Sequence, residues 1–321
     1  MTDGRSSAAP RKRRVIFIAQ QKWAIGYVHD CVAARLRPLG YEFGSYNPLH
    51  FDLGDFLTDV ARSDVVITTA NLNRDIQTIL TSDAQKRKIL VLGHGSSEFS
   101  GVESEYSEHI TYAVTSDVAA PFCKRPVLLM PNGVELEHFE RRVRDGHVRT
   151  LGWCGSRYGP KRMGWSHDIA HATQLPVTIA MSLPRDELKK WYHGVDVLLI
   201  NSGAESHIET GPLPAFEAIA SGCVVVGTSV GNFRLVPGPK YATVAEAATI
   251  INELKQNPDA VRRLADEQYA CVRAHWCYEV LVDRWREAID RVAERGATVP
   301  ETKKADEPVA TATGDAPSSG E

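Results

Sequence analysis

The fold is decided by a short stretch near residue 210, Glu209-Thr-Gly-Pro-Leu-Pro-Ala-Phe-Glu217, and by Ala218-Ile-Ala-Ser-Gly-Cys-Val-Val-Val-Gly-Thr228 directly after it. Glu209 falls in a Gly/Pro loop, and Glu217 falls in the opening turns of a helix that stops at Gly222. A β-branched strand follows. A helix N-terminus attracts phosphate, and a carboxylate there can bind sugar hydroxyls. Two carboxylates and a helix start at the carboxyl edge of a sheet therefore predict a seat for a nucleotide bearing a sugar.

Short apolar runs alternate with helical patterns on both sides of this stretch. Strands are predicted at 15–19, 41–45, 64–69, 88–92, 109–114, 127–130, 150–154, 177–181, 196–201 and 223–228. Helices are predicted at 26–38, 52–62, 73–83, 116–122, 162–173, 184–193, 213–221, 244–256, 258–273 and 276–294. Such alternation is typical of parallel sheets with helices on both faces. We expect an α/β fold with two Rossmann-like domains, and ligands at the carboxyl ends of their strands.

The composition divides the chain and narrows its class. Two domains are expected at 15–140 and 141–275, joined by the basic, polar segment 141–149, with disordered ends at 1–14 and 296–321. The net charge of −3 argues against a general nucleic-acid binder. No apolar run has the length of a membrane span, and six scattered cysteines indicate reduced core residues of a cytoplasmic protein.

Four segments carry a resemblance to a known family. They are Val127-Leu-Leu-Met-Pro-Asn-Gly-Val-Glu-Leu-Glu-His-Phe139, Leu151-Gly-Trp-Cys-Gly-Ser-Arg-Tyr-Gly-Pro-Lys161, Trp191-Tyr-His-Gly-Val-Asp-Val-Leu-Leu-Ile-Asn-Ser202 and Glu209 to Glu217. In this order they resemble family 4 glycosyltransferases, most closely over residues 127–231. The resemblance implies the GT-B architecture, in which two Rossmann-like domains face each other across a cleft. It also implies that the helix 276–295 crosses back onto the first domain.

The resemblance implies a reaction and its partners. A sugar passes from a nucleotide diphosphate sugar to an acceptor hydroxyl of a glycan, lipid carrier or small molecule, with retention of anomeric configuration. The second domain holds the donor and the first domain the acceptor. No metal or other cofactor is expected, because fixed cations neutralise the diphosphate. Peripheral contact with the inner membrane face is one option.

Donor-side roles follow residue by residue from the same resemblance. Glu217 binds the ribose, and Glu209 with the amides of Thr210 and Gly211 orients the sugar. Gly155, Arg157 and Lys161 hold the diphosphate. Here the chain departs from the family: Thr210 replaces a glycine, and Pro212 removes one N–H donor. A shortened spacing also leaves open whether Lys161 or Arg162 contacts the diphosphate.

On the acceptor side, the candidates are His94, in a Gly-His-Gly turn after a strand, and Gly26 at the first strand–helix turn. A histidine there suits proton handling. The segment Trp23-Ala-Ile-Gly26 is no GxGxxG fingerprint, which argues against a dehydrogenase.

Other interpretations remain open at this point. Glu217 could serve the helix dipole, Glu209 could be a solvated loop acid, and His94 could be structural. A glycoside hydrolase could use the two glutamates as acid and base, if their carboxyls stand roughly 5–9.5 Å apart. A non-catalytic module that binds a sugar nucleotide is a third candidate.

Overall fold

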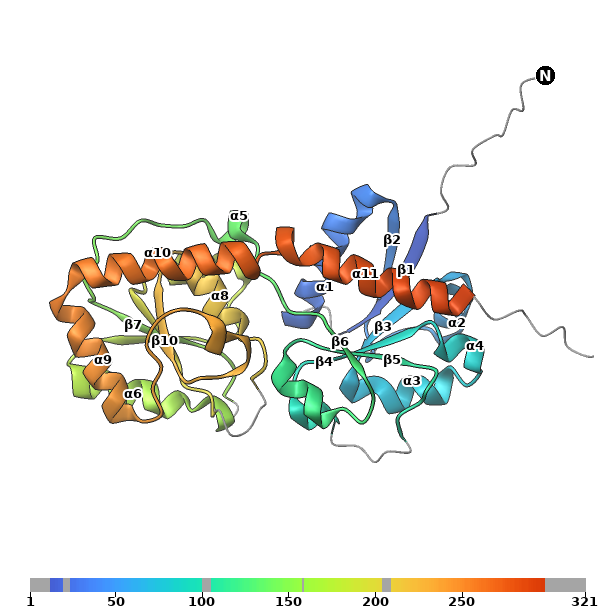
Figure 1. Cartoon of the computed structure of the whole chain (residues 1–321), viewed down its shortest axis with the longest axis horizontal. Coiled ribbons are helices and arrows are strands. Elements are labelled where there is room, and N and C mark those ends of the chain that lie inside the picture. Colours follow the sequence, from blue (N-terminus) through green and yellow to red (C-terminus); the bar gives the residue numbers. More distant parts are fainter. Residues whose placement is uncertain (1–11, 20–23, 100–104, 158, 204–208, 298–321) are drawn as a thin grey trace, which may run out of the picture.

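The computed structural model describes residues 12–19, 24–99, 105–157, 159–203 and 209–297, which form two parallel sheets side by side (Figure 1). The first sheet, in the order β2-β1-β3-β4-β5-β6, contains β1 (Arg13–Ile18), β2 (Tyr41–Tyr46), β3 (Val65–Thr69), β4 (Ile89–Gly93), β5 (Thr111–Val114) and β6 (Val127–Leu129). The second, in the order β10-β9-β7-β8, contains β7 (Leu151–Cys154), β8 (Val177–Ala180), β9 (Val197–Ile200) and β10 (Val224–Gly227). The predicted α/β fold with two Rossmann-like domains is confirmed.

Helices cover both faces of each sheet. They are α1 (Ala24–Leu36), α2 (Leu53–Arg62), α3 (Asn73–Ile79), α4 (Asp83–Lys86), α5 (Leu136–Phe139), α6 (Met163–Thr173), α7 (Arg185–His193), α8 (Leu213–Ala220), α9 (Val244–Gln256), α10 (Pro258–His275) and α11 (Tyr278–Ala297). One face of the first sheet packs on α1 and α11, and the other packs on α2 and α3. In the second domain, α5, α7, α8 and α10 share one core, and α6 and α9 share another.

Two predicted helices of the first domain differ in the structure. The predicted helix 73–83 is two helices, because α3 ends at Ile79 and Ser82 starts α4 with a capping box to Gln85. The segment 117–122 is a 3-10 helix that contains Pro121, which cannot donate an α-helical hydrogen bond. Both differences shorten the predicted α-helices and leave the neighbouring strands in place.

The chain passes between the domains twice, at neighbouring positions. The Val134 amide donates to the Trp276 carbonyl (2.9 Å), and the Tyr278 amide donates to the Val134 carbonyl (3.2 Å). Phe139, in α5, already belongs to the core of the second domain. The crossing therefore lies at Val134, several residues before the expected boundary at 140.

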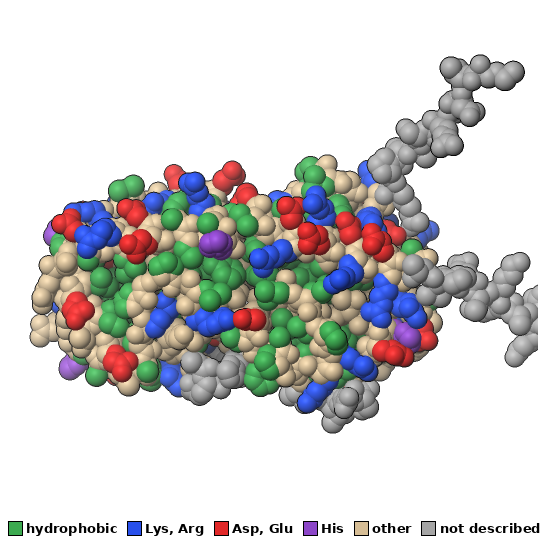
Figure 2. All heavy atoms as spheres, in the orientation of Figure 1, with side chains coloured by type: hydrophobic (Ala, Val, Ile, Leu, Met, Phe, Trp, Pro, Cys, Tyr) green, Lys and Arg blue, Asp and Glu red, His purple; other side chains and the backbone are tan. Residues whose placement is uncertain are grey.

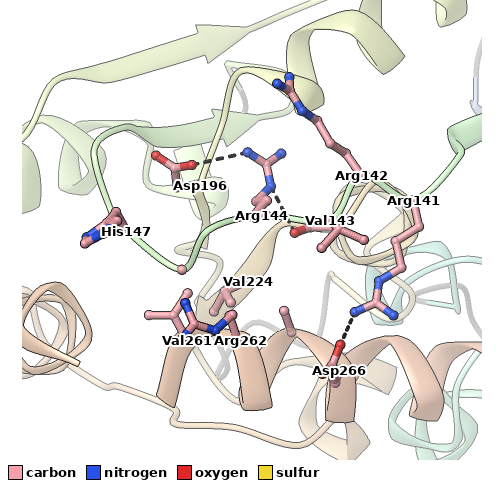
Figure 3. Close-up of a pocket in the computed structure, with 13 residues that line it drawn as sticks. Arg141, Arg142, Val143, Arg144, His147, Asp196, Val224, Val261, Arg262 and Asp266 are labelled. Carbon is pink, nitrogen blue, oxygen red and sulfur yellow. Dashed lines mark hydrogen bonds and ion pairs between the residues drawn. The ribbon is translucent and has the colours of Figure 1, made fainter. Parts of the chain in front are cut away.

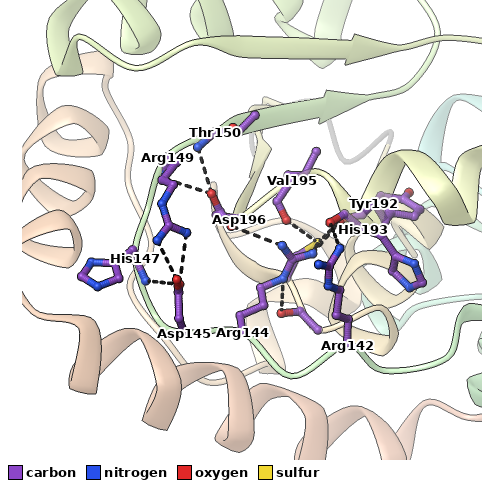
Figure 4. A network of polar contacts seen from close by, with 12 residues as sticks. Arg142, Arg144, Asp145, His147, Arg149, Thr150, Tyr192, His193, Val195 and Asp196 are labelled. Atoms are coloured by element: carbon purple, nitrogen blue, oxygen red, sulfur yellow. Dashed lines mark hydrogen bonds and ion pairs between the residues drawn. The ribbon is translucent and has the colours of Figure 1, made fainter.

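The segment 141–149, predicted as the linker, instead packs along the amino edge of the second sheet (Figure 4). Arg144 donates to the carbonyls of Tyr192 (2.8 Å) and Gly222 (3.0 Å) and pairs with Asp196 at 3.2 Å. Asp196 in turn accepts from the amide of Thr150 (3.0 Å). These contacts explain why a polar, arginine-rich sequence lies fixed on a domain instead of spanning two.

A cavity with about 570 Å³ of empty space lies between this segment and α10 (Figure 3). Its cations are engaged within the protein: Arg141 pairs with Asp266, and Arg144 pairs with Asp196. Because Asp196 precedes β9, the cavity sits at the end of the sheet opposite to the Glu209 loop.

Helix α11 fastens the end of the second domain to the first. It extends from α10 across the first sheet in Figure 1, and it packs beside α1. Trp285 is fully buried there, and its indole N–H donates to the Pro131 carbonyl (3.4 Å).

The surface carries charges of both signs, and the cysteines, all of which the structure describes, form no disulfide bonds. On the face shown in Figure 2, basic and acidic side chains are interspersed over both domains. All six cysteines are unpaired thiols. Within the described part of the chain, every helix is too short or too polar to span a bilayer.

We expect Trp285→Ala to lower the free energy of unfolding by about 3–5 kcal/mol, because it empties a fully buried site. Urea denaturation followed by fluorescence and circular dichroism measures the change. Val280→Ala, on an exposed position of the same helix, is the matched control and should change stability little. Equal effects of the two substitutions would show that α11 does not stabilise the first domain.

Candidate functional site

The loops that follow β7 and β9 meet at the carboxyl edge of the second sheet. The ammonium of Lys161, after β7, lies 3.0 Å from Oε2 of Glu209, after β9. The hydroxyl of Ser202 donates to the same oxygen at 3.5 Å. Their side chains are 25% and 16% exposed for Lys161 and Glu209, so the pair is shielded from bulk water but still reachable. A recess with about 240 Å³ of empty space adjoins it, lined by Trp153, Cys154, Lys161, Leu199, Ile200, Asn201, Ser202, Glu209, Pro212 and Pro214.

The structure distinguishes Lys161 from its neighbour Arg162. Lys161 faces Glu209, whereas the guanidinium of Arg162 lies over the ring of Trp165, 4.5 Å from its centroid. Arg157 is exposed in the same loop, and Gly155 lies where a Cβ would come within 3.3 Å of the Lys161 side chain. Of the two alternatives, only Lys161 is placed beside the signature glutamate.

Glu217 occupies the second turn of α8 and is buried, with 8% of its surface exposed. The hydroxyl of Tyr192 donates to its Oε2 at 3.0 Å. Burial raises the pKa of Glu217 to about 7, while the Tyr192 hydrogen bond and the charge of Arg185 partly oppose this shift. Near neutral pH, Glu217 is therefore protonated in part of the molecules and ionised in the rest.

Cys154, at the end of β7, connects the two carboxylates in space. Burial raises the pKa of its thiol to about 12, with a further contribution from the negative charge of Glu217 and an opposing one from Lys161. Cys154 also lines the recess beside Glu209. Glu209 and Glu217 thus lie in one neighbourhood, each with a different hydrogen-bond partner.

Thr210 joins the two domains. Its hydroxyl donates to the carbonyl of His94, which follows β4 of the first sheet. It also shares a hydrogen bond of 2.8 Å with the hydroxyl of Thr115, which follows β5. The carboxyl ends of the two sheets therefore touch at this residue, where the family pattern has a glycine.

Asn232 supports this contact with two hydrogen bonds. The main-chain N–H of Asn232 donates to the Thr210 carbonyl (2.8 Å), and its side chain donates to the Thr115 carbonyl (2.8 Å). Gly231 precedes it at φ +41°, and a Cβ there would come within 2.1 Å of the Thr210 carbonyl oxygen. Gly211 lies close to the side-chain amides of Asn132 and Asn232.

An ion pair spans the same interface. Arg234 donates to both oxygens of Asp117, at 2.8 and 2.6 Å. Asp117 belongs to the first domain and Arg234 follows β10 of the second. Burial and this arginine act in opposite directions on the pKa of Asp117, and the net effect lowers it. The closed arrangement of the domains is therefore held by charge as well as by hydroxyl contacts.

His94 lies at the interface, but its chemistry differs from the expectation. Its Nε2 atom is enclosed and has no hydrogen-bond partner within the described residues. Burial lowers the pKa of His94 to about 4, so the ring is neutral at pH 7 and can only accept or donate a hydrogen bond. Gly26 is buried within α1.

Several interface residues were not identified as site residues from the sequence alone. Thr115, Asp117 and Arg234 contact partners about a hundred positions away, and no local pattern marks them. Asn132 lies in a recognisable Pro-Asn-Gly turn, whereas the turn Ser229–Asn232 after the last strand is a sequence candidate for the donor side that an ordinary turn explains almost as well. No cluster of three or more possible metal ligands exists among the side chains that the structure describes.

Comparisons with known proteins support the architecture. No protein-family model and no curated protein matches the chain. Among solved structures, AviGT4, a glycosyltransferase involved in avilamycin A biosynthesis, matches with a TM-score of 0.59 and 15% identity over 89% of this chain and 98% of its own. Anabaena HepE in complex with UDP-glucose matches with a TM-score of 0.65 and 11% identity, over 86% and 99%.

An α-glucosyltransferase in complex with UDP and a 13-mer DNA matches with a TM-score of 0.67 and 11% identity, covering 87% of this chain and 99% of its own. At such low identity these likenesses establish the fold. The chain has the GT-B architecture, with two Rossmann-like domains whose carboxyl edges meet.

The pKa of Glu217 predicts how stability depends on pH. Between its ordinary value of 4.5 and about 7, the folded protein keeps a proton that the unfolded chain has lost. Stability should therefore fall as pH rises through this window, by at most about 1.4 kcal/mol per pH unit from this group.

Glu217→Gln removes this contribution, so the difference in stability between the wild type and the variant should change with pH from 4.5 to 7. Denaturation midpoints at five pH values measure it. The difference isolates Glu217, because burial also raises the pKa of Glu98, and that group is common to both proteins. A difference independent of pH would contradict the account.

Proposed function

We propose that the protein transfers a hexosyl group from a nucleotide diphosphate sugar to an acceptor hydroxyl. The observation that carries this proposal is the Lys161–Glu209 pair, a cation and a carboxylate held together at the carboxyl edge of the second sheet. In open α/β sheets this edge is the usual ligand site. The GT-B fold supports the same assignment.

When the donor binds, its groups would replace contacts that the protein now makes within itself. Its diphosphate displaces Glu209 from Lys161, since a diphosphate carries more negative charge than one carboxylate. The carboxylate of Glu209 is then available to hydroxyls of the sugar. Exposed Arg157, in the same loop, supplies a second cation to the diphosphate.

The chemical step follows from this charge arrangement. As the bond between the sugar and the diphosphate breaks, negative charge grows on the leaving oxygen, and the fixed cations Lys161 and Arg157 stabilise it. Positive charge grows on the sugar ring, which lies beside Glu209. We propose retention of configuration and membership of family 4, in line with the four sequence segments, and no requirement for a metal.

Glu217 has the surroundings for binding ribose. Its carboxylate accepts from Tyr192 and lies near Cys154, which lines the Glu209 recess, so two ribose hydroxyls would donate to it once it is ionised. Neutral His94 fits a hydrogen-bonding role toward the sugar or acceptor better than a proton store.

The hydrolase alternative is less well supported. An acid and base pair must flank one bond from two sides. Glu209 pairs with Lys161, whereas Glu217 is buried on Tyr192 within α8. The non-catalytic alternative keeps nucleotide binding and predicts no turnover.

A panel of nucleotide sugars tested by thermal shift checks the proposal. A donor at 100 times its dissociation constant should add about 2.7 kcal/mol of stability. Coupled detection of released nucleoside diphosphate then tests turnover with glycan, lipid-linked and small-molecule acceptors. No response to any nucleotide sugar would rule out the transferase assignment, and binding without turnover would favour the binding module.

Two substitutions separate the proposed roles. Glu217→Ala should weaken nucleotide binding, because it removes the ribose contact, whereas Glu209→Ala should mainly lower kcat. Asp186→Ala, at an exposed acid of the same domain, serves as the control and should leave both quantities unchanged. Normal turnover by both glutamate variants would refute the role assignments.

A further inference from the structure

A second pocket lies in the first domain, beyond His94. It has about 790 Å³ of empty space at the carboxyl ends of β3 and β4, on the sheet face that packs against α2 and α3. The predicted acceptor residue Gly26 lies in α1 on the opposite face. The pocket therefore lies on the face of the sheet away from Gly26 and beside His94, the other predicted acceptor residue.

The polar lining of this pocket combines planar hydrogen-bonding groups. The Asn71 carbonyl oxygen is bonded to the Thr69 hydroxyl, so its amide N–H groups point to other partners. The guanidinium of Arg74, 80% exposed, lies 4.0 Å from Glu105. Glu98 adds a carboxyl group from the 3-10 helix after β4. Amide, guanidinium and carboxyl groups together offer both donors and acceptors.

Aromatic side chains form the other part of the lining. Phe99, Tyr106 and Tyr112 all border the pocket, and the rings of the two tyrosines lie 5.4 Å apart. Apolar ring surface beside a few fixed polar groups is the usual composition of a small-molecule site. These rings are almost fully buried, with 1–7% of their surface exposed, so they form the floor of the pocket, and the hydroxyls of a sugar would bond to the planar groups around it.

The pocket is connected to the donor side through one turn of backbone. Oε2 of Glu98 accepts from the His94 main-chain N–H at 2.9 Å. The carbonyl of the same His94 accepts from the Thr210 hydroxyl, next to Glu209. A ligand that contacts Glu98 is thus linked, through the main chain of His94, to the interface where the two sheets meet.

We propose that this pocket binds an uncharged carbohydrate portion of the acceptor, with Asn71, Arg74 and Glu98 as its hydrogen-bonding groups. The inference rests on the proposed function, and it names the substrate class of the acceptor side. The charges favour a neutral ligand, because the lining holds two carboxyl groups and one arginine, and Arg74 already lies 4.0 Å from Glu105. The protonation of Glu98 is consistent with this ligand class: burial raises its pKa to about 7, so it can donate to or accept from a hydroxyl.

Saturation-transfer NMR with the full chain, without nucleotide, tests the pocket. The probes are the methyl α- and β-glycosides of glucose, galactose, mannose and N-acetylglucosamine, together with maltose and cellobiose. We expect transfer to at least one probe. Asn71→Ala and Glu98→Gln should each weaken its binding by about five- to tenfold, the effect of losing one hydrogen bond.

Controls keep the result specific. Glu98→Gln preserves the acceptor for the His94 amide, so a lost signal cannot be assigned to a broken turn. Asp75→Asn, at an exposed position of α3 that does not line the pocket, should keep the signal. Absence of transfer from every probe, or transfer that both pocket variants leave unchanged, would overturn the proposal.

The outcome is independent of the nucleotide test. Sugar binding that both pocket variants weaken supports the pocket even if no nucleotide sugar shifts the melting temperature, in which case the proposed function fails alone. A nucleotide response without any binding of the neutral probes removes the pocket and leaves the transferase proposal standing.

Discussion

The hydroxyl of Thr210 is the contact on which the arrangement of this molecule depends. It reaches from the second sheet to the His94 carbonyl and the Thr115 hydroxyl of the first, so the carboxyl edges of both sheets are brought together. The Arg234–Asp117 ion pair reinforces the same interface. At the other side, the chain crossings at Val134 and Cys277 pair with each other, and α11 returns to the first core. Closure at the loops and attachment at the hinge together hold the site residues in place.

Much of this fold can be predicted from the sequence, because buried parallel strands consist of continuous runs of β-branched residues. Val224–Gly227 and Val65–Thr69 are examples, and both lie within two residues of their predicted limits. The break between α3 and α4 was missed, since the capping signal at Ser82 competes with a periodic helical pattern. The linker prediction at 141–149 is wrong for a different reason. Its polar composition is typical of a linker, but Arg144 donates to carbonyl groups of the second domain and so holds the segment there.

The site could be predicted only in part. Glu209, Lys161 and Glu217 carry a spacing that marks them, and the structure places them near one another. Thr115 and Arg234 have no such spacing, because their partners come from the other domain. Nor does sequence reveal the protonation of buried groups. His94 was expected to handle protons, yet burial lowers its pKa to about 4, while burial of Glu98 and Glu217 raises theirs to about 7. Burial therefore brings Glu98 and Glu217, and not His94, into the range where they titrate near neutral pH.

Lys161 is the residue proposed to receive the diphosphate of a nucleotide. Calorimetric titration of UDP and of ADP into the wild type and into Lys161→Met tests this most directly. We expect that at least one of the two nucleotides binds the wild type and binds the variant at least about tenfold more weakly, since a charge-assisted contact is lost. Equal affinity of the two proteins for that nucleotide would contradict it.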